Sequence, residues 1–243
     1  MNEERTLTKE QQQAFEEMLQ EKTYCGDAFS AFRLFTNYLK GTNGFRKDPD
    51  KAFEYLKISS DLGYPHAINL LKLLYSGNDL YGLKIERDLR KRIECLEKLS
   101  VADQLFDFST VTEEERNEFY QMEWNALAEL GRLYILDSTL YEEDNYKGYC
   151  LSLYVTGQKG TPESLCMLGY YFDCYRPPQY VPSNTLLKKR GNLGTALYYY
   201  ECAINTDNSK YANLALEQYN RLAEQINVSE GRTEENMIPY YRR

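Results

Sequence analysis

The sequence predicts an all-α protein in which about four to five helical hairpins stack, somewhat irregularly, into an α-α superhelix, or solenoid. Two observations carry this prediction. A pattern that begins at Gly26 starts again 37 residues later at Gly63 and recurs, less completely, further along the chain. Within each copy the apolar residues recur at intervals of three or four, the period of an α-helix. Because one such helix pair cannot cover its own apolar face, successive pairs are expected to stack.

The N-terminal part of the chain is predicted to hold a cap and two repeats. Residues 1–24 are expected to form an N-terminal capping helix, and residues 25–103 the first two repeats. In the first copy, Ser30, Leu34 and Tyr38 lie four positions apart. They therefore share one face of a helix, which is the face expected to pack against its partner.

The second helix of the first repeat has a predicted start and end. Asp48 is a preferred N-cap residue, and Pro49 suits the first helical turn because its fixed φ angle is already helical. Gly63 is expected to end this helix, and Tyr64-Pro65 to open the next one.

The rest of the chain continues the pattern with interruptions. Residues 104–124 are predicted to be an acidic linker or an inserted helix, residues 125–227 to hold repeats three and four with a terminal helix, and residues 228–243 to form a C-terminal tail. Gly131 and Gly169 each follow a leucine at the same position of the repeat. Because glycine inside a helix costs about 1 kcal/mol relative to alanine, we expect both to allow close approach of the paired helix.

The charge and hydrophobicity of the chain exclude several classes of function. The 243 residues include 29 Lys and Arg against 37 Asp and Glu, a formal net charge of −8. Because phosphate binding depends on Lys and Arg, no nucleic acid is expected as a partner. No stretch approaches the roughly 20 apolar residues of a membrane helix, so no membrane partner is expected. The five glutamates among the first 20 residues argue against a signal peptide, and we expect a cytoplasmic protein.

Catalytic and cofactor-binding motifs are missing from the sequence. The single histidine, His66, follows a proline at an expected helix start, and one histidine cannot supply two metal ligands. A structural or surface role is expected for it. Glycine-rich phosphate loops and metalloprotease motifs do not occur. The sequence therefore predicts a protein that is not an enzyme and that has no cofactor and no metal.

The six cysteines are predicted to be reduced and to serve mainly as small buried apolar residues. Cys166 and Cys174 lie eight positions apart in one expected helix, about 12 Å along its axis. That separation exceeds the roughly 7 Å limit between the Cα atoms of a disulfide. The chain has no Cys-x-x-Cys motif of the kind that binds zinc.

One run of residues is complete between Gly26 and Gly63: Gly-Asp-Ala…Leu…Tyr-Leu-x-Gly…Asp-x-x-Lys-Ala-x-x-Tyr…Gly. This run resembles the Sel1-like repeat, a relative of the tetratricopeptide repeat. The resemblance extends over residues 26–75 and, less closely, over residues 125–175. It implies an α-α solenoid that binds other proteins and has no catalytic activity of its own.

In solenoids of this kind the first helix of each pair lines the concave face. Some first-helix residues lie outside the stripe that packs within a repeat, and their chemistry changes from copy to copy, as recognition residues can. They are Arg33, Thr36, Leu70, Leu73, Glu129, Arg132, Met167 and Tyr170. We expect them to bind another protein with a basic surface, because the acidic chain attracts positive charge.

The predicted function is a scaffold or adaptor that holds a partner protein on this face. The alternative is an immunity or inhibitor protein that neutralises a basic toxin or effector. Charge complementarity would favour this alternative because it raises the rate of association. No oligomeric state follows from the sequence.

Overall fold

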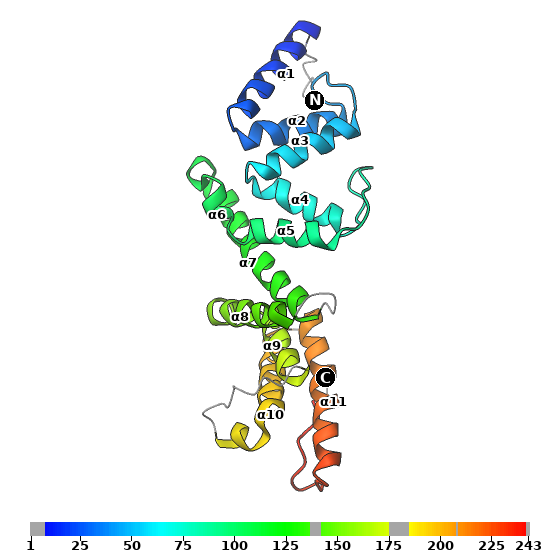
Figure 1. Cartoon of the computed structure of the whole chain (residues 1–243), viewed down its shortest axis with the longest axis vertical. Coiled ribbons are helices and arrows are strands. Elements are labelled where there is room, and N and C mark those ends of the chain that lie inside the picture. Colours follow the sequence, from blue (N-terminus) through cyan, green and yellow to red (C-terminus); the bar gives the residue numbers. More distant parts are fainter. Residues whose placement is uncertain (1–7, 137–141, 175–184, 208, 242–243) are drawn as a thin grey trace, which may run out of the picture. The chain divides into compact units, whose positions relative to one another are not determined.

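The computed structural model describes residues 8–136, 142–174, 185–207 and 209–241 (Figure 1). Over these residues the regular elements are helices, apart from one isolated bridge between Leu80 and Leu83. The predicted all-α class is therefore confirmed for the described part of the chain. None of the helices in this part is both long enough and apolar enough to span a membrane.

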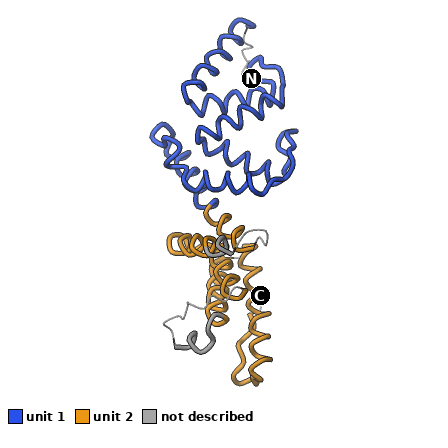
Figure 2. Tube along the Cα trace, in the orientation of Figure 1, with its two compact units in different colours: residues 1–126 blue, residues 127–243 orange. Residues whose placement is uncertain are grey.

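The chain divides into two compact units, residues 1–126 and residues 127–243 (Figure 2). The division falls inside the long helix α7 (Glu113–Leu136), whose first half belongs to unit 1 and whose second half belongs to unit 2.

Unit 1 is built from helices that pack on their neighbours in the chain. They are α1 (Lys9–Tyr24), α2 (Ala28–Lys40), α3 (Pro49–Asp61), α4 (Pro65–Tyr75), α5 (Leu89–Leu99), the short α6 (Ala102–Leu105) and the 3-10 helix η1 (Phe108–Thr110). Helix α1 packs on α2, α2 on α3, α3 on α4 and α4 on α5. Helix α1 lies among the residues expected to form a capping helix, and α2 to α5 lie among those expected to form the first two repeats. The assignment of these helices to repeats stays a prediction.

Aspartate side chains set the start of three of these helices. Asp27, Asp48 and Asp88 each lie at an N-cap and accept a hydrogen bond from a backbone N–H of the first turn. This satisfies one of the donors that a helix start leaves without an intrahelical partner. At Asp48 the cap is followed by Pro49 at the first helical position, as the sequence indicates.

Residues 104–124 contain the end of α6, all of η1 and the first half of α7. Helix α7 begins at Glu113 and continues without a break to Leu136. The residues expected to form an inserted helix and those expected to begin a third repeat thus belong to one continuous helix.

In unit 2, the second half of α7 and four further helices pack around one core. These are α8 (Glu142–Gln158), α9 (Pro162–Cys174), α10 (Thr185–Ile204) and α11 (Lys210–Ser229). Helix α11 packs on α9 as well as on α10. The core between them includes the fully buried side chains of Met167, Phe172 and Tyr200.

The two mid-helix glycines lie where paired helices approach closely, as predicted. A Cβ atom added to Gly131 would lie 2.6 Å from Oγ of Ser152 on α8. One added to Gly169 would lie 2.5 Å from Cδ1 of Tyr200 on α10. Real Cβ atoms do not come this close to a neighbour, so a side chain at either position would displace an atom of the facing helix.

The cysteines confirm the predicted burial only in part. All six are free thiols. Cys95 and Cys166 are buried, whereas Cys25, Cys150 and Cys174 are exposed.

We predict that only the exposed thiols react quickly with Ellman's reagent in the native protein at about pH 8. The thiolate is the reactive form, and burial raises the pKa of Cys95 to about 11 and that of Cys166 to about 12. These two thiols should react only after denaturation, and the denatured, unreduced chain should give six thiols. Four or fewer would contradict the prediction, because it would reveal a disulfide.

Candidate functional site

Within the described residues, no group of three or more His, Cys, Asp or Glu side chains is arranged to hold a metal ion. The features that stand out are surfaces rather than clusters of reactive groups. One of them lies in unit 1, where eight rings from α2, α4, η1, α7 and the adjoining segments form a continuous chain of contacts. We call these rings the aromatic row: Phe29, Phe32, Tyr64, His66, Phe106, Phe108, Phe119 and Tyr120.

Neighbouring rings of the aromatic row have centroids 5.0–6.4 Å apart. Phe119 is completely buried at its centre, while Phe29 and Tyr120 at the two ends are 48% and 42% exposed. Edge-to-face and offset contacts of this kind favour fixed ring orientations. The row therefore presents two exposed aromatic residues on a rigid base.

The segment that carries half of this row also carries most of the net charge of the chain. Residues 1–100 contain 16 acidic and 16 basic side chains, whereas residues 101–126 contain seven acidic side chains and one basic one. We call the latter the acidic segment. Its acidic residues are Asp103, Asp107, Glu113, Glu114, Glu115, Glu118 and Glu123. Five of the seven are exposed, and Glu115 and Glu123 are half-buried.

Local hydrogen bonds hold two of these carboxylates in their charged form. Oδ1 of Asp107 accepts a hydrogen bond from the backbone N–H of Ser109 (2.9 Å), and hydrogen bonding to Ser109 lowers the pKa of Asp107. The carboxylate of Glu115 accepts from the backbone N–H of Thr112 (3.0 Å) and from its hydroxyl (2.8 Å), which lowers the pKa of Glu115. Both carboxylates are ionised at neutral pH and contribute to the negative charge of the surface.

The single basic residue of the acidic segment takes part in an internal contact. Nε of Arg116 donates a hydrogen bond to the carbonyl oxygen of Phe108 (3.2 Å). This contact ties the start of α7 to η1. Because Arg116 is one positive charge among seven negative ones, the segment keeps a strong negative field, which favours approach of Lys and Arg side chains.

His66 is packed within the aromatic row. Its ring lies 5.0 Å from that of Phe119, and Nε2 lies 3.9 Å from a carboxylate oxygen of Glu118. These contacts agree with a structural or surface role for the only histidine of the chain.

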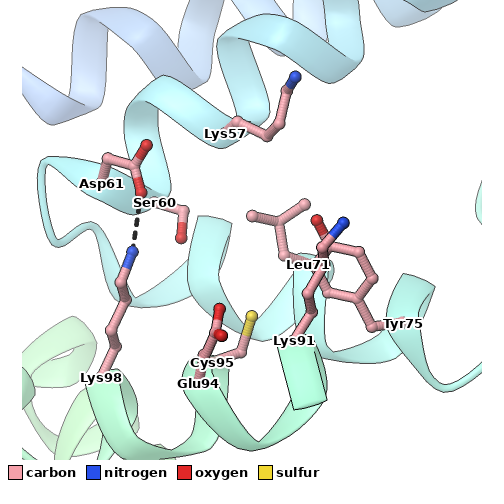
Figure 3. A pocket seen from close by; sticks show the side chains of 9 residues that line it. All are labelled: Lys57, Ser60, Asp61, Leu71, Tyr75, Lys91, Glu94, Cys95 and Lys98. Carbon is pink, nitrogen blue, oxygen red and sulfur yellow. Dashed lines mark hydrogen bonds and ion pairs between the residues drawn. The ribbon is translucent and has the colours of Figure 1, made fainter. Parts of the chain in front are cut away.

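A second feature of unit 1 is a hollow of about 160 Å³ between α3 and α5, with α4 at its base (Figure 3). We call it the α3–α5 groove. Its lining residues are Lys57, Ser60, Asp61, Leu71, Tyr75, Lys91, Glu94, Cys95 and Lys98. Nζ of Lys98 reaches across it to Oδ1 of Asp61 (2.7 Å), as Figure 3 shows.

The α3–α5 groove has no arrangement suited to catalysis. Burial raises the pKa of its Cys95 thiol to about 11, so the thiol is protonated at neutral pH and is a poor nucleophile. The three lysines stand against two carboxylates, so the groove is of mixed charge. It lies between the second helices of the two hairpins, on residues that the sequence analysis does not select.

Four of the sequence-predicted contact residues belong to unit 1. Arg33 is exposed, and its guanidinium carbon lies 5.1 Å from the centre of the Phe15 ring on α1. Oγ1 of Thr36 donates a hydrogen bond to the carbonyl oxygen of Phe32 (2.9 Å). Leu70 and Leu73 are half-buried on α4.

The other four belong to unit 2, where the structure brings Glu129 and Arg132 together. Nε of Arg132 lies 2.9 Å from the carboxylate of Glu163, and one of its terminal nitrogens lies 3.8 Å from Glu129. Tyr170 is half-buried against the core. Met167 is 0% exposed and is a core residue rather than a surface contact. The reason is that α9 packs against α8, α10 and α11 at once.

The sequence alone does not reveal the aromatic row. Its residues come from three separated parts of the chain, and only the fold brings them together. The available signal was the density of phenylalanine and tyrosine within the acidic segment, at positions 106, 108, 119 and 120.

Comparison of the sequence with models of known protein families gives no match, and comparison with curated proteins gives none. The resemblance to the Sel1-like repeat therefore stays a prediction that rests on the residues between Gly26 and Gly63.

Proposed function

We propose that this chain is a non-enzymatic protein–protein interaction module, a scaffold or adaptor whose hairpins α2–α3 and α4–α5 are Sel1-like repeats of a short solenoid. In this proposal its partner has a basic surface and docks on the acidic segment and the exposed ends of the aromatic row. A cytoplasmic location is part of the proposal, and six free thiols agree with a reducing compartment.

The observation that carries the proposal is the coincidence of concentrated negative charge and an exposed aromatic side chain, Tyr120, on one segment. Exposed Tyr120 shares a face of α7 with exposed Glu113, seven positions before it, and lies within two turns of Glu114 and Glu118. Aromatic side chains and charge complementarity contribute differently to an interface. Desolvated aromatic residues dominate the binding energy, and cations favour aromatic faces. Charged residues at the rim mainly raise the association rate.

The second candidate function is an inhibitor that neutralises a basic toxin or effector. The concentration of seven acidic residues within residues 101–126 favours it, because a rapid association with a basic domain is what an inhibitor of this type requires. An adaptor would bring its partner together with further proteins, whereas an inhibitor would abolish the partner's activity at a one-to-one ratio.

We predict that the double variant Glu114→Lys/Glu118→Lys loses its partner. The test is affinity capture from the native host with the full chain, followed by mass spectrometry of the co-eluting proteins. The variant should capture at most about one tenth as much of a basic protein as the wild type does. The reason is that its two new lysines repel the positive charges of the partner's surface. The matched control is Glu217→Lys/Glu224→Lys on α11, which makes the same change in net charge at exposed positions and should retain the partner fully.

The purified partner then allows the association rate to be measured at several salt concentrations. The rate for the wild type should fall as salt rises, since the attraction is screened over about 8 Å at physiological ionic strength. Equal retention of the partner by both double variants would refute the choice of this surface.

A further inference from the structure

The C-terminal segment of the chain folds back along α11. After α11 ends, Gly231 has a positive φ of 60°, and residues 233–236 form a turn. The backbone N–H of Thr233 donates to Oδ1 of Asn236 (2.9 Å), and that of Asn236 donates to the carbonyl oxygen of Thr233 (3.0 Å). The turn reverses the direction of the chain, so the following residues run antiparallel to the helix.

Two asparagines of α11 bind the backbone of this returning segment. The side-chain amide of Asn227 donates to the carbonyl oxygen of Ile238 (3.0 Å) and accepts from its N–H (2.7 Å). The side-chain amide of Asn220 does the same for Tyr241, at 3.0 and 2.9 Å. Each asparagine therefore satisfies both backbone groups of one residue, as a neighbouring β-strand would.

The spacing of these bonds matches the geometry of an extended peptide. Asn220 and Asn227 are seven residues apart, which is about 10.5 Å along a helix. Ile238 and Tyr241 are three residues apart, which is about 10 Å in a nearly extended chain. In the returning segment, backbone groups of Ile238 and Tyr241 form all four hydrogen bonds. These bonds therefore do not depend on the side chains of the segment.

Side-chain contacts add selectivity at the same two positions. Ile238 is 4% exposed and belongs to the core of unit 2. The Tyr241 ring packs edge-on against that of Tyr219, with centroids 4.8 Å apart, and its hydroxyl donates to the carboxylate of Glu201 on α10. Between them, Pro239 and Tyr240 are exposed.

We propose that α10 and α11 form a binding site for an extended peptide with an apolar residue three positions before a tyrosine, and that residues 238–241 of this chain occupy it in cis. The ligand is such a segment of a partner protein, which binds by displacing residues 238–241 of this chain. Helices α10 and α11 belong to unit 2, whereas the acidic segment of the proposed function belongs to unit 1. A tethered occupant has an effective concentration in the millimolar range for a short linker. Residues 238–241 therefore compete effectively with weakly binding segments. Only a partner segment with matching side chains at the positions of Ile238 and Tyr241 displaces them.

The proposal can be tested on the full chain with a specific protease site inserted into the turn at residues 233–236. The protein folds with its tail in place, and cleavage then removes the tether without removing the segment. The probe is a fluorescent synthetic peptide of residues 236–243, and its uptake is followed by anisotropy. We expect saturable uptake by the cleaved protein and at least about tenfold weaker binding by the uncleaved protein.

Variants of the peptide and of the helix identify the contacts. An Ile238→Asp peptide should not bind, while a Tyr240→Ala peptide should bind as the wild type does, because Tyr240 points to solvent. In the protein, Asn220→Ala/Asn227→Ala should weaken uptake at least about tenfold. Gln225→Ala is the matched control, since Gln225 is exposed two positions from Asn227, on the other side of the helix.

Several results would overturn the proposal. A cleaved protein that keeps its circular dichroism spectrum but takes up no peptide would show that the site does not exchange its occupant. Equal binding of the wild-type and Ile238→Asp peptides would show adventitious uptake. A dimer of the uncleaved chain that disappears with Ile238→Asp would assign the site to the tail of a second copy instead of a partner. The peptide variants leave the protein unchanged, so the test does not depend on every protein variant folding.

Discussion

Replacing Gly169 with leucine is expected to destabilise unit 2 by about 3 kcal/mol or more, and replacing it with alanine by about 1–3 kcal/mol, as overpacked cores do. A Cβ atom at this position would lie 2.5 Å from Cδ1 and 2.6 Å from Cε1 of Tyr200. The Tyr200 ring is fully buried in the core of unit 2. It cannot swing into solvent, so even one methyl group forces α9 and α10 apart.

Gly157 on α8 provides the matched control, because a Cβ atom there would meet no other atom within 4 Å. Gly157→Ala should raise the free energy of unfolding by about 0.5–1 kcal/mol, since alanine loses less backbone freedom on forming a helix. Urea denaturation of the three variants and the wild type measures these differences. Equal midpoints for Gly169→Ala and the wild type would show that the Tyr200 contact does not constrain this position.

The features that the sequence predicts well are local ones. An N-cap aspartate with proline after it, as at Asp48 and Pro49, acts within one turn of helix, and the structure has the helix start there. The shared repeat position of Gly131 and Gly169 predicts the close approach of a paired helix, and in the structure the next helix along the chain lies against each of them. The cost of alanine at position 169 depends on the Tyr200 ring, which sequence alone does not place.

The features that the sequence could not predict depend on contacts between distant residues. In the sequence, Asn220 and Asn227 are ordinary polar residues of a helix. Only the fold places Ile238 and Tyr241 beside them, where the hydrogen bonds form. Met167 belongs to a helix in which nine of 13 residues are buried. The apolar stripe on one face of α9 does not show that three helices surround this helix. For that reason Met167, which is predicted to lie on the surface, lies in the core.

The aromatic row illustrates the same limit at the candidate site. Phe29, Tyr64 and Phe119 lie far apart in the sequence and share no repeat position. Their contacts depend on how the segment after α5 packs against the turn between α3 and α4. The composition shows that residues 104–124 are acidic, but it does not show that they lie beside these rings.

The position of that segment depends on Gly63, and replacing this residue tests it. Gly63 follows the end of α3 with a φ of +87°, and a Cβ atom would lie 2.8 Å from the carbonyl oxygen of Leu105. Gly63→Ala is therefore expected to combine two costs. The left-handed backbone conformation costs about 1–2 kcal/mol for an alanine, and the clash with the backbone adds about 1–3 kcal/mol.

Gly26→Ala separates these two costs, because Gly26 has a nearly identical φ of +90° and a Cβ atom there would meet nothing within 4 Å. It should lower the free energy of unfolding by the backbone contribution alone, and Gly63→Ala by that amount plus the clash. Leu105 directly precedes Phe106 of the aromatic row, so relief of the clash displaces the row and the acidic segment next to it. Gly63→Ala should therefore also weaken partner binding at temperatures where the variant is still folded, whereas Gly26→Ala should not. Equal denaturation midpoints for the two variants, measured in urea, would show that the segment after α5 is not held against Gly63 and that this contact does not position the proposed binding surface.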